Sequence, residues 1–296
     1  MRGRFFCLII VLATLAVVMQ PAAWGYRESA HLAKTSVGFQ LYRNYLIVIQ
    51  GSVGPLKGLN FLLDTGANTT VLDPRLAQKL HLDATPTSVA VPSGRAEGGI
   101  GTIPSLRFGP IHKDNIRVFI MDLSFLQHAL PIQIDGILGL DVLGQSTFVI
   151  DYSSRKIRFS PASPMPDSIP LQLEDGLAFV DAVVNHTRVR LLVDTGAPSM
   201  IIFEEVPNWQ SGPKGDDAQP SPRPSSTKIG DFERKRERQI SFSLGAVEFG
   251  HESALVASNH KDAGHDFDGM MSPVALGITR VEVNLTQRTL AFARKP

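Results

Sequence analysis

The sequence predicts a mostly β protein that contains two copies of one structural unit. Three sequence blocks occur twice and in the same order: "LLDTGANTTVL" with "LVDTGAPSMII", "DGILGLDVLG" with "DGMMSPVALG", and "FVIDYSSRKIRF" with "VEVNLTQRTLAF". The second copies begin at positions 192, 268 and 281, which are 130, 133 and 133 residues after the first copies at 62, 135 and 148. A shared order with so little drift indicates duplication of a unit of roughly 125 residues, which is too long for a solenoid repeat.

Short apolar runs bounded by polar or glycine-containing turns predict β-strands in both units. These runs lie at 44–51, 59–64 and 116–122 in the first unit, and at 177–184, 189–194 and 254–258 in the second. The closing segments at 148–159 and 281–292 alternate apolar and polar residues, as strands with one buried face do. Each unit is therefore expected to be mainly strand.

A helix is expected in the first unit directly after Asp73. Asp73 can cap this helix, and Pro74 suits its first position. Its expected inward-facing residues are Leu76, Ala77 and Leu80. Short helices are also expected after each Asp-Gly block, at 140–143 and near Val274.

The chain of 296 residues is long enough for two lobes. We expect lobe 1 at 26–162 and lobe 2 at 163–296, with a proline-rich linker at 161–170. Residues 208–238 include few large apolar side chains, so they predict a mobile polar loop inside lobe 2.

Residues 1–25 predict a secretory signal peptide. Arg2 and Arg4 precede an apolar run at 5–19, and the small residues that end at Gly25 suit cleavage there. A retained membrane anchor is the alternative, because the run approaches spanning length. We expect an exported protein, periplasmic or secreted, or membrane-anchored if the segment is not cleaved.

Composition narrows the possible chemistry. A net charge of +1 gives no reason to expect nucleic acid or an anionic membrane as the main partner. The single cysteine, Cys7, lies in the predicted signal, so the mature chain would have no thiol nucleophile and no cysteine-ligated metal. No histidine accompanies a serine in a nucleophile-elbow context, so a serine hydrolase is not supported.

The repeated Asp-Thr-Gly tripeptide, at 64–66 and 194–196, is the strongest chemical signal. An aspartate at the end of an apolar strand is desolvated, which raises its pKa. The glycine permits a sharp turn and leaves its N–H free to point at the carboxylate, while the threonine hydroxyl can reach a matching loop. Two such loops would bring two carboxylates together, and these would titrate as a pair with one proton between them. Such a pair can activate a water for attack on a peptide carbonyl without a metal or cofactor.

Each of the segments 64–67 and 194–197, both Asp-Thr-Gly-Ala, is followed by an Asp-Gly block that begins at Asp135 or Asp268, intervals of 71 and 74 residues. In these features residues 40–296 resemble the retropepsin-like aspartic proteases, most closely bacterial two-repeat aspartyl proteases with a signal peptide. The resemblance implies a bilobal, pepsin-like acid protease fold of two duplicated β-barrel lobes. It implies aspartic endopeptidase activity with no cofactor and no metal.

The resemblance also implies a set of site residues. Asp64 and Asp194 are the expected catalytic pair. The expected supports of the catalytic loops are Thr65, Gly66, Ala67, Thr195, Gly196 and Ala197. The residues expected beneath the loops are Asp135, Gly136, Ile137, Leu138, Gly139, Asp268 and Gly269. The expected substrate is a polypeptide in extended conformation, and the expected species is a monomer with two pseudo-symmetric lobes.

The segment "EGGIGTI" at 97–103 resembles the glycine-rich flap of retroviral relatives. The resemblance implies that Gly98, Gly99, Ile100 and Gly101 belong to a lid over the substrate, made mobile by its glycines. A surface hairpin with glycine at its turn is the alternative. The second unit has no matching glycine cluster, so only lobe 1 is expected to supply such a lid.

The second unit departs from the first near the expected site. Ser272 and Pro273 stand where the first unit has Gly139 and Leu140, and Pro198 follows the second Asp-Thr-Gly-Ala. These changes leave open a secreted peptide-binding protein of the same fold with weak or no catalysis. In addition, the alanines after both motifs lack a hydroxyl that would lower the carboxyl pKa values, which predicts a mildly acidic pH optimum.

Two further alternatives concern metal and assembly. The segment 260–268, "HKDAGHDFD", gathers two histidines and three aspartates, although a solvated loop explains it more simply than a metal site. Pairing of like lobes between two chains is the other alternative, and a monomeric active species would exclude it.

Overall fold

The computed structural model describes residues 35–91, 94–127, 130–144, 147–159, 167–204, 206, 236–257 and 266–294. Of these residues, 61% lie in strands and 6% in helices, which confirms the predicted mostly β class. Within those ranges, no helix has the length and apolar character needed to cross a membrane. The predicted signal peptide and the predicted lobe boundary at 162/163 lie outside the described residues, so both remain predictions.

The first sheet, which we call lobe 1, has eight strands. In spatial order these are β2 (Gln40–Tyr42), β3 (Leu46–Val53), β4 (Leu56–Leu63), β9 (Gly136–Leu138), β5 (Val71–Leu72), β8 (Ile111–Ile120), β7 (Gly94–Phe108) and β6 (Thr85–Val91). An additional pairing of β3 with β7 closes six of these strands into a barrel.

The second sheet, which we call lobe 2, has seven strands and the same closure. In spatial order these are β13 (Gln172–Glu174), β14 (Leu177–Val184), β15 (Thr187–Val193), β19 (Gly269–Met271), β16 (Met200–Phe203), β18 (Val247–Ala257) and β17 (Arg236–Leu244). Pairing of β14 with β17 closes this barrel.

The two barrels correspond strand for strand. In each, a parallel pair joins the strand before the Asp-Thr-Gly motif to the strand of the Asp-Gly block, with Leu62 opposite Ile137 in lobe 1 and Leu192 opposite Met270 in lobe 2. These partners are separated by the offsets of 130 and 133 residues that the sequence blocks show. The sequence duplication is therefore a duplication of the barrel.

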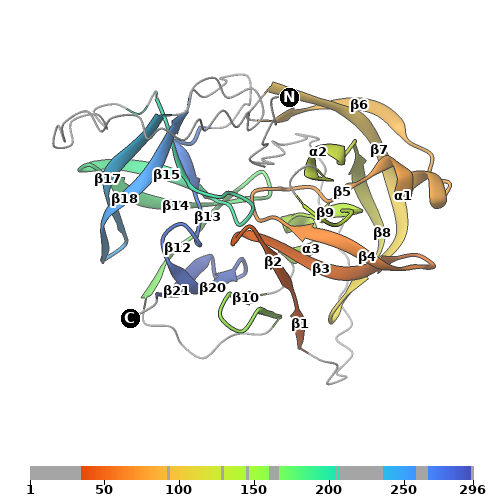
Figure 1. Ribbon diagram of the computed structural model, residues 1–296, viewed down its shortest axis with the longest axis horizontal. Helices are drawn as coiled ribbons and strands as arrows, with labels where there is room; N and C mark the ends of the chain where they lie inside the picture. The colour runs from red at the N-terminus through yellow and green to blue at the C-terminus, as the bar shows by residue number, and fades with distance from the viewer. Residues whose placement is uncertain are drawn as a thin grey trace.

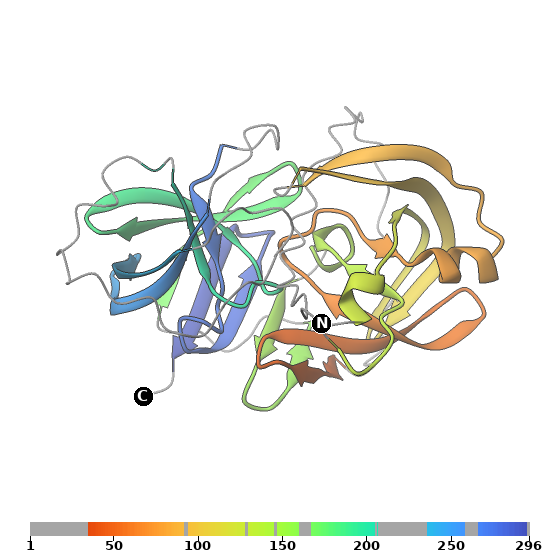
Figure 2. The ribbon, with the colours of Figure 1, turned by 45° about the horizontal axis from the view of Figure 1, so that its top comes forward.

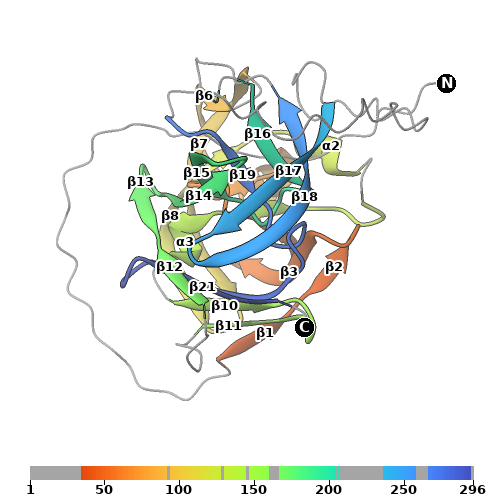
Figure 3. The ribbon, with the colours of Figure 1, turned by 90° about the vertical axis from the view of Figure 1, so that its left-hand side faces the viewer.

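A third, interlobe sheet contains strands from both units and lies below the two lobes (Figures 1 and 3). In spatial order its strands are β1 (Ser36–Gly38), β11 (Lys156–Arg158), β10 (Phe148–Asp151), β20 (Ile278–Asn284), β21 (Thr289–Arg294) and β12 (Asp167–Pro170). At its centre β10 pairs antiparallel with β20, with Ile150 opposite Val281. One continuous apolar core includes buried residues of this sheet and of both lobes.

The helices are short. The predicted helix after Asp73 is α1 (Pro74–Lys79), where the Asp73 side chain accepts a hydrogen bond from the Arg75 N–H, and the predicted helix at 140–143 is α3 (Leu140–Leu143). A further helix, α2 (Ser124–Gln127), is not predicted from the sequence.

The helix predicted near Val274 is wrong. The Gly277 N–H donates to the Val274 carbonyl and the Ile278 N–H to the Pro273 carbonyl, at 3.0 Å each. With Gly277 at a φ of +65°, these two bonds end the turn in a Schellman-type motif before a helix can extend.

Two predicted irregular segments are partly strand. Asp167–Pro170, at the end of the predicted linker, forms β12 and pairs with β21. Residues 236–238, at the end of the predicted polar loop, begin β17 and pair with β18. Pairing with a partner that is distant in sequence overrides the polar, proline-rich composition of these segments. The rest of the predicted loop, 208–235, lies outside the described residues.

Candidate active site

Asp64 and Asp194 follow β4 and β15 directly, at the ends of fully buried strand segments. The Asp64 N–H donates to the Leu138 carbonyl and the Asp194 N–H to the Met271 carbonyl, at 3.0 Å each. Thus each aspartate is held by the strand of its own Asp-Gly block. Both aspartates are completely buried, with 0% of their surface exposed.

The glycines that follow bring the two loops into contact. The Gly66 N–H donates to Asp64 Oδ1 at 2.8 Å, and the Gly196 N–H donates to Asp194 Oδ1 at 2.7 Å. A Cβ atom at Gly66 would lie 2.8 Å from Asp194 Cγ, and one at Gly196 would lie 3.1 Å from Asp64 Cγ. Each glycine therefore faces the carboxyl group of the other loop, at a distance that a side chain would obstruct.

The two threonines cross-link the loops. The Thr65 N–H donates to Thr195 Oγ1 and the Thr195 N–H to Thr65 Oγ1, at 3.1 Å each. The Thr65 hydroxyl also donates to the Val193 carbonyl at 2.7 Å. These bonds join the loops across the interface between the lobes, which is the contact that the sequence predicts for the threonine hydroxyls.

Burial and proximity raise the pKa values of both carboxyl groups. For Asp64, desolvation raises the pKa well above its ordinary value, and the charge of Asp194 raises it further. For Asp194, desolvation raises the pKa to about 6, although hydrogen bonds from Asp64 and from the Gly196 and Ala197 N–H groups oppose the increase. The Oδ2 atoms of both aspartates accept no hydrogen bond from any described residue. Two buried carboxyl groups so arranged are expected to share one proton over a wide pH range.

The loop of lobe 1 is supported from below by main-chain and side-chain bonds. The Leu140 N–H donates to the Ala67 carbonyl at 2.7 Å. A Cβ atom at Gly139 would lie 2.7 Å from the same carbonyl oxygen, so only glycine fits there. Asp141 accepts from the Thr70 N–H at 2.9 Å and from its hydroxyl at 2.8 Å, which fixes the far end of the loop.

Lys113 completes this support by donating from Nζ to the Asp141 carbonyl at 2.8 Å. Burial lowers the pKa of Lys113 to about 8 and raises the pKa of Asp141, while the hydrogen bonds from Thr70 and the charge of Lys113 oppose the increase for Asp141. The sequence analysis missed Thr70, Asp141 and Lys113. The only available signal was that Thr70 and Asp141 lie beside the two repeated blocks.

The loop of lobe 2 obtains the equivalent bond in another way. Pro273 stands at the position of Leu140 and has no N–H to donate. The buried hydroxyl of Ser272 donates instead to the Ala197 carbonyl, at 2.7 Å. The serine that departs from the glycine of lobe 1 thus replaces the donor that the proline removes.

Asp135 and Asp268 of the two Asp-Gly blocks do not join the central pair. Asp135 accepts from the Asn60 N–H at 2.9 Å, and Asp268 accepts from the Arg190 N–H at 2.7 Å. These bonds fasten β9 and β19 to the strands that lead to the aspartate loops. A Cβ atom at Gly136 would lie 2.6 Å from the Val71 carbonyl oxygen, and one at Gly269 would lie 2.1 Å from the Ile201 carbonyl oxygen, so both glycines permit close strand packing. Ile137 and Leu138 are buried in β9.

The glycines expected in a flap lie within an arm of the β6–β7 hairpin, which extends along the top of lobe 1 toward lobe 2 (Figure 2). The hairpin reverses between Val91 and Gly94, whereas Gly98, Gly99, Ile100 and Gly101 pair with β6, and the last three also pair with β8. A Cβ atom at Gly98 would lie 2.3 Å from the Ile120 carbonyl oxygen. The expectation of a mobile, glycine-based turn is therefore wrong at these positions, because the glycines serve close packing of β7 against β8.

The suggested metal segment, 260–268, lies largely outside the described residues. Among those described, no three His, Cys, Asp or Glu side chains are grouped so that they could hold a metal ion.

Comparison with known proteins places part of the chain in a family. The family model described as aspartyl protease matches residues 49–142, which include the loop of Asp64, the β6–β7 hairpin and the block beneath the loop. No curated protein matches the chain. Residues 49–142 of this chain belong to the aspartyl protease family, within the retropepsin-like clan.

Proposed function

We propose that the protein is an aspartic endopeptidase that hydrolyses peptide bonds with a water activated between Asp64 and Asp194. The family match supports a protease of this kind. The observation that carries the proposal is the contact of the two aspartate loops, with both carboxyl groups buried and each facing the glycine of the other loop.

In this mechanism the pair begins with one proton. The ionised carboxylate removes a proton from the water as the water oxygen attacks the peptide carbonyl carbon. When the tetrahedral intermediate breaks down, the carbon–nitrogen bond opens and a carboxyl group transfers a proton to the leaving nitrogen. Because both pKa values are raised, the singly protonated pair persists in mildly acidic conditions.

The substrate in this proposal is a polypeptide in extended conformation, and the active species is a monomer that contains both lobes. The two aspartates come from the two units of one chain, which supports a site that needs no second copy. An exported location, periplasmic or secreted, remains part of the proposal and rests on the first 25 residues.

Cleavage of an unfolded protein such as reduced, carboxymethylated casein tests the proposal across pH 3 to 8. We expect cleavage with a mildly acidic optimum, and we expect Asp64→Asn and Asp194→Asn each to remove it. Asp181→Asn is the matched control, because Asp181 is an exposed aspartate on β14. A rate maximum below pH 3 would contradict the expected pKa values. Binding of the casein by the wild type without cleavage at any pH would instead favour a peptide-binding protein.

A further inference from the structure

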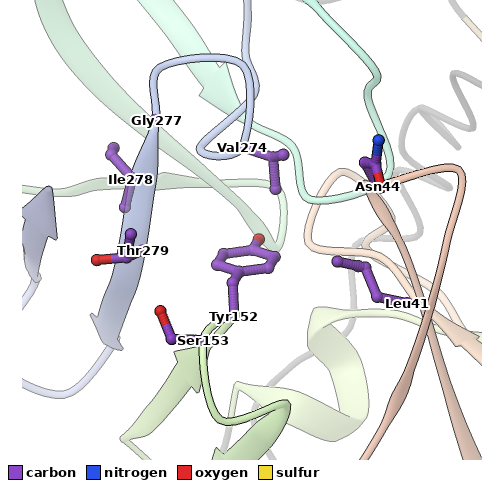
Figure 4. Close-up of a pocket in the computed structure, with 8 residues that line it drawn as sticks. All are labelled: Leu41, Asn44, Tyr152, Ser153, Val274, Gly277, Ile278 and Thr279. Carbon is purple, nitrogen blue, oxygen red and sulfur yellow. The ribbon is translucent and has the colours of Figure 1, made fainter. Parts of the chain in front are cut away.

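A pocket of about 270 Å³ lies where the two lobes meet the interlobe sheet (Figure 4). Leu41 and Asn44 approach it from the β2–β3 connection of lobe 1, and Val274 from the turn before β20. Tyr152, directly after β10, and Thr279 of β20 come from the interlobe sheet. The pocket therefore spans the junction of the two units, away from the strands that carry the aspartate loops.

The hydroxyl of Tyr152 is the unusual feature of this pocket. Its oxygen is buried and has no hydrogen-bond partner among the described residues. In Figure 4 the ring stands at the centre of the group, with its hydroxyl directed toward Val274. A buried polar atom without a partner is costly, so its retention needs a reason.

The position of the Tyr152 ring is well defined. Its N–H donates to the Thr279 carbonyl at 2.9 Å, and the Phe39 ring packs edge-on at a centroid distance of 6.3 Å. Burial, with a further contribution from the charge of Asp194, raises the pKa of Tyr152, so the phenol stays protonated and available as a donor. The pocket thus contains a fixed hydrogen-bond donor surrounded mainly by aliphatic side chains.

The duplicated half of the molecule indicates that packing alone does not require this hydroxyl. The residue equivalent to Tyr152, 133 positions later, is Leu285. A Cβ atom at Gly144, which corresponds to Gly277 beside the pocket, would lie 2.6 Å from Leu285 Cδ1. An aliphatic side chain therefore packs tightly in one half, whereas the other half has a phenol and an open space.

We infer that this interlobe pocket binds a small neutral molecule with an apolar body and one hydrogen-bond acceptor, such as an amide or ketone carbonyl, which receives the Tyr152 hydroxyl. None of the lining residues carries a charge, so a neutral ligand is favoured over an ion. The volume is at the small end of ligand pockets, which suits a compound of one ring. The inference does not depend on protease activity.

Benzamide is a suitable probe because it has one apolar ring and one carbonyl acceptor. Binding is measured by saturation-transfer NMR titration of the full chain, with benzoate as the charged analogue of the same shape. We expect benzamide to bind in the millimolar range and benzoate to bind at least tenfold more weakly. Absence of benzamide binding, or equal binding of benzoate, would overturn the inference.

Two variants locate the binding. Tyr152→Phe removes only the hydroxyl and should weaken benzamide about fivefold, the effect of one net hydrogen bond. Val274→Phe should fill the pocket and abolish binding. Tyr42→Phe, at a partly exposed tyrosine whose hydroxyl donates to Gln40, is the matched control and should bind like the wild type. Cooperative thermal unfolding of each variant confirms that it is folded. Unchanged benzamide affinity in Tyr152→Phe or Val274→Phe would overturn the assignment.

Discussion

The two aspartate loops are nearly identical, whereas the segments that support them are built from different side chains. Both loops carry Asp-Thr-Gly-Ala and exchange the same pair of threonine bonds. Beneath them, the alanine carbonyl accepts from the Leu140 main chain in lobe 1 and from the Ser272 side chain in lobe 2. The comparison teaches that the hydrogen bond to that carbonyl is retained, while the atom that donates it is not.

A second difference concerns the polar support of lobe 1. The positions equivalent to Thr70 and Asp141, by the offsets of 130 and 133, are Met200 and Val274. Both members of the hydrogen-bonded pair are thus replaced by apolar residues. This is expected of a buried polar pair, because loss of one member alone leaves the other without its partner.

The largest expected effect tests whether the two aspartates are equivalent. Both pKa values are raised on folding, so each carboxyl contributes stability below its unfolded pKa of about 4, and this contribution is lost as pH rises through the folded pKa. For Asp194, with a folded pKa of about 6, the loss is on the order of 3 kcal/mol. Asp64→Asn and Asp194→Asn should therefore both stabilise the protein near pH 7, as urea unfolding at pH 4 and pH 7 would measure.

Asp181→Asn again serves as the control for this comparison and should leave the pH dependence unchanged. Stabilisation by only one of the two central variants would mean that the loops are not electrostatically equivalent. Unchanged stability in both would contradict the buried, coupled pair.

The next effect concerns the glycine that lobe 2 has replaced. Gly139→Ser places a Cβ atom 2.7 Å from the Ala67 carbonyl oxygen, which forces the backbone to shift. We expect a destabilisation of about 2 to 3 kcal/mol, measured by urea unfolding. Gly38→Ser is the control, because a Cβ atom there meets nothing closer than 4.0 Å. If lobe 1 accepted serine at 139 at no cost, the two supports would be interchangeable.

A smaller effect is expected at Ser272. Ser272→Ala removes the donor to the Ala197 carbonyl and should cost about 1 to 2 kcal/mol, because a buried acceptor loses its partner. Ser168→Ala, at an exposed serine on β12, is the control. In a Ser272→Gly background, Pro273→Leu should recover part of the loss by restoring a main-chain donor, as in lobe 1. Failure of this recovery would argue against the proposed exchange of donors.

The smallest effect is a coupling energy in lobe 1. Thr70→Met and Asp141→Val, which introduce the residues of lobe 2, should each destabilise the protein. The double variant should lose less than the sum of the single variants by about 1 kcal/mol, because neither partner is left unpaired. Strict additivity in a double-mutant cycle of urea unfolding would contradict a mutually dependent pair.

Much of the fold and of the candidate site could be predicted from local pattern. The strand runs, the helix after Asp73 and the duplication are properties of short segments and their spacing. The burial of Asp64 and Asp194 follows from the apolar strands that precede them. The role of Ser272 could not be predicted, because its value depends on the distance between its hydroxyl and a carbonyl in another loop.

The errors have a common physical origin. The glycines at 98–101 suggested a mobile turn, yet they lie in a strand where β8 approaches too closely for a side chain. Residues 167–170 and 236–238 have compositions typical of loops, yet each pairs with a strand distant in the sequence. In each case a contact with a remote segment outweighed the local preference.

The sequence by itself determined that this protein is duplicated, is mostly β and has two equivalent aspartate loops, because repeats, strand periodicity and Asp-Thr-Gly motifs are written in consecutive residues. Only the tertiary structure decided how the loops are supported, why the hairpin glycines are needed and where Tyr152 faces open space. Those features depend on the approach of atoms from segments up to 130 residues apart, and no local pattern specifies such distances.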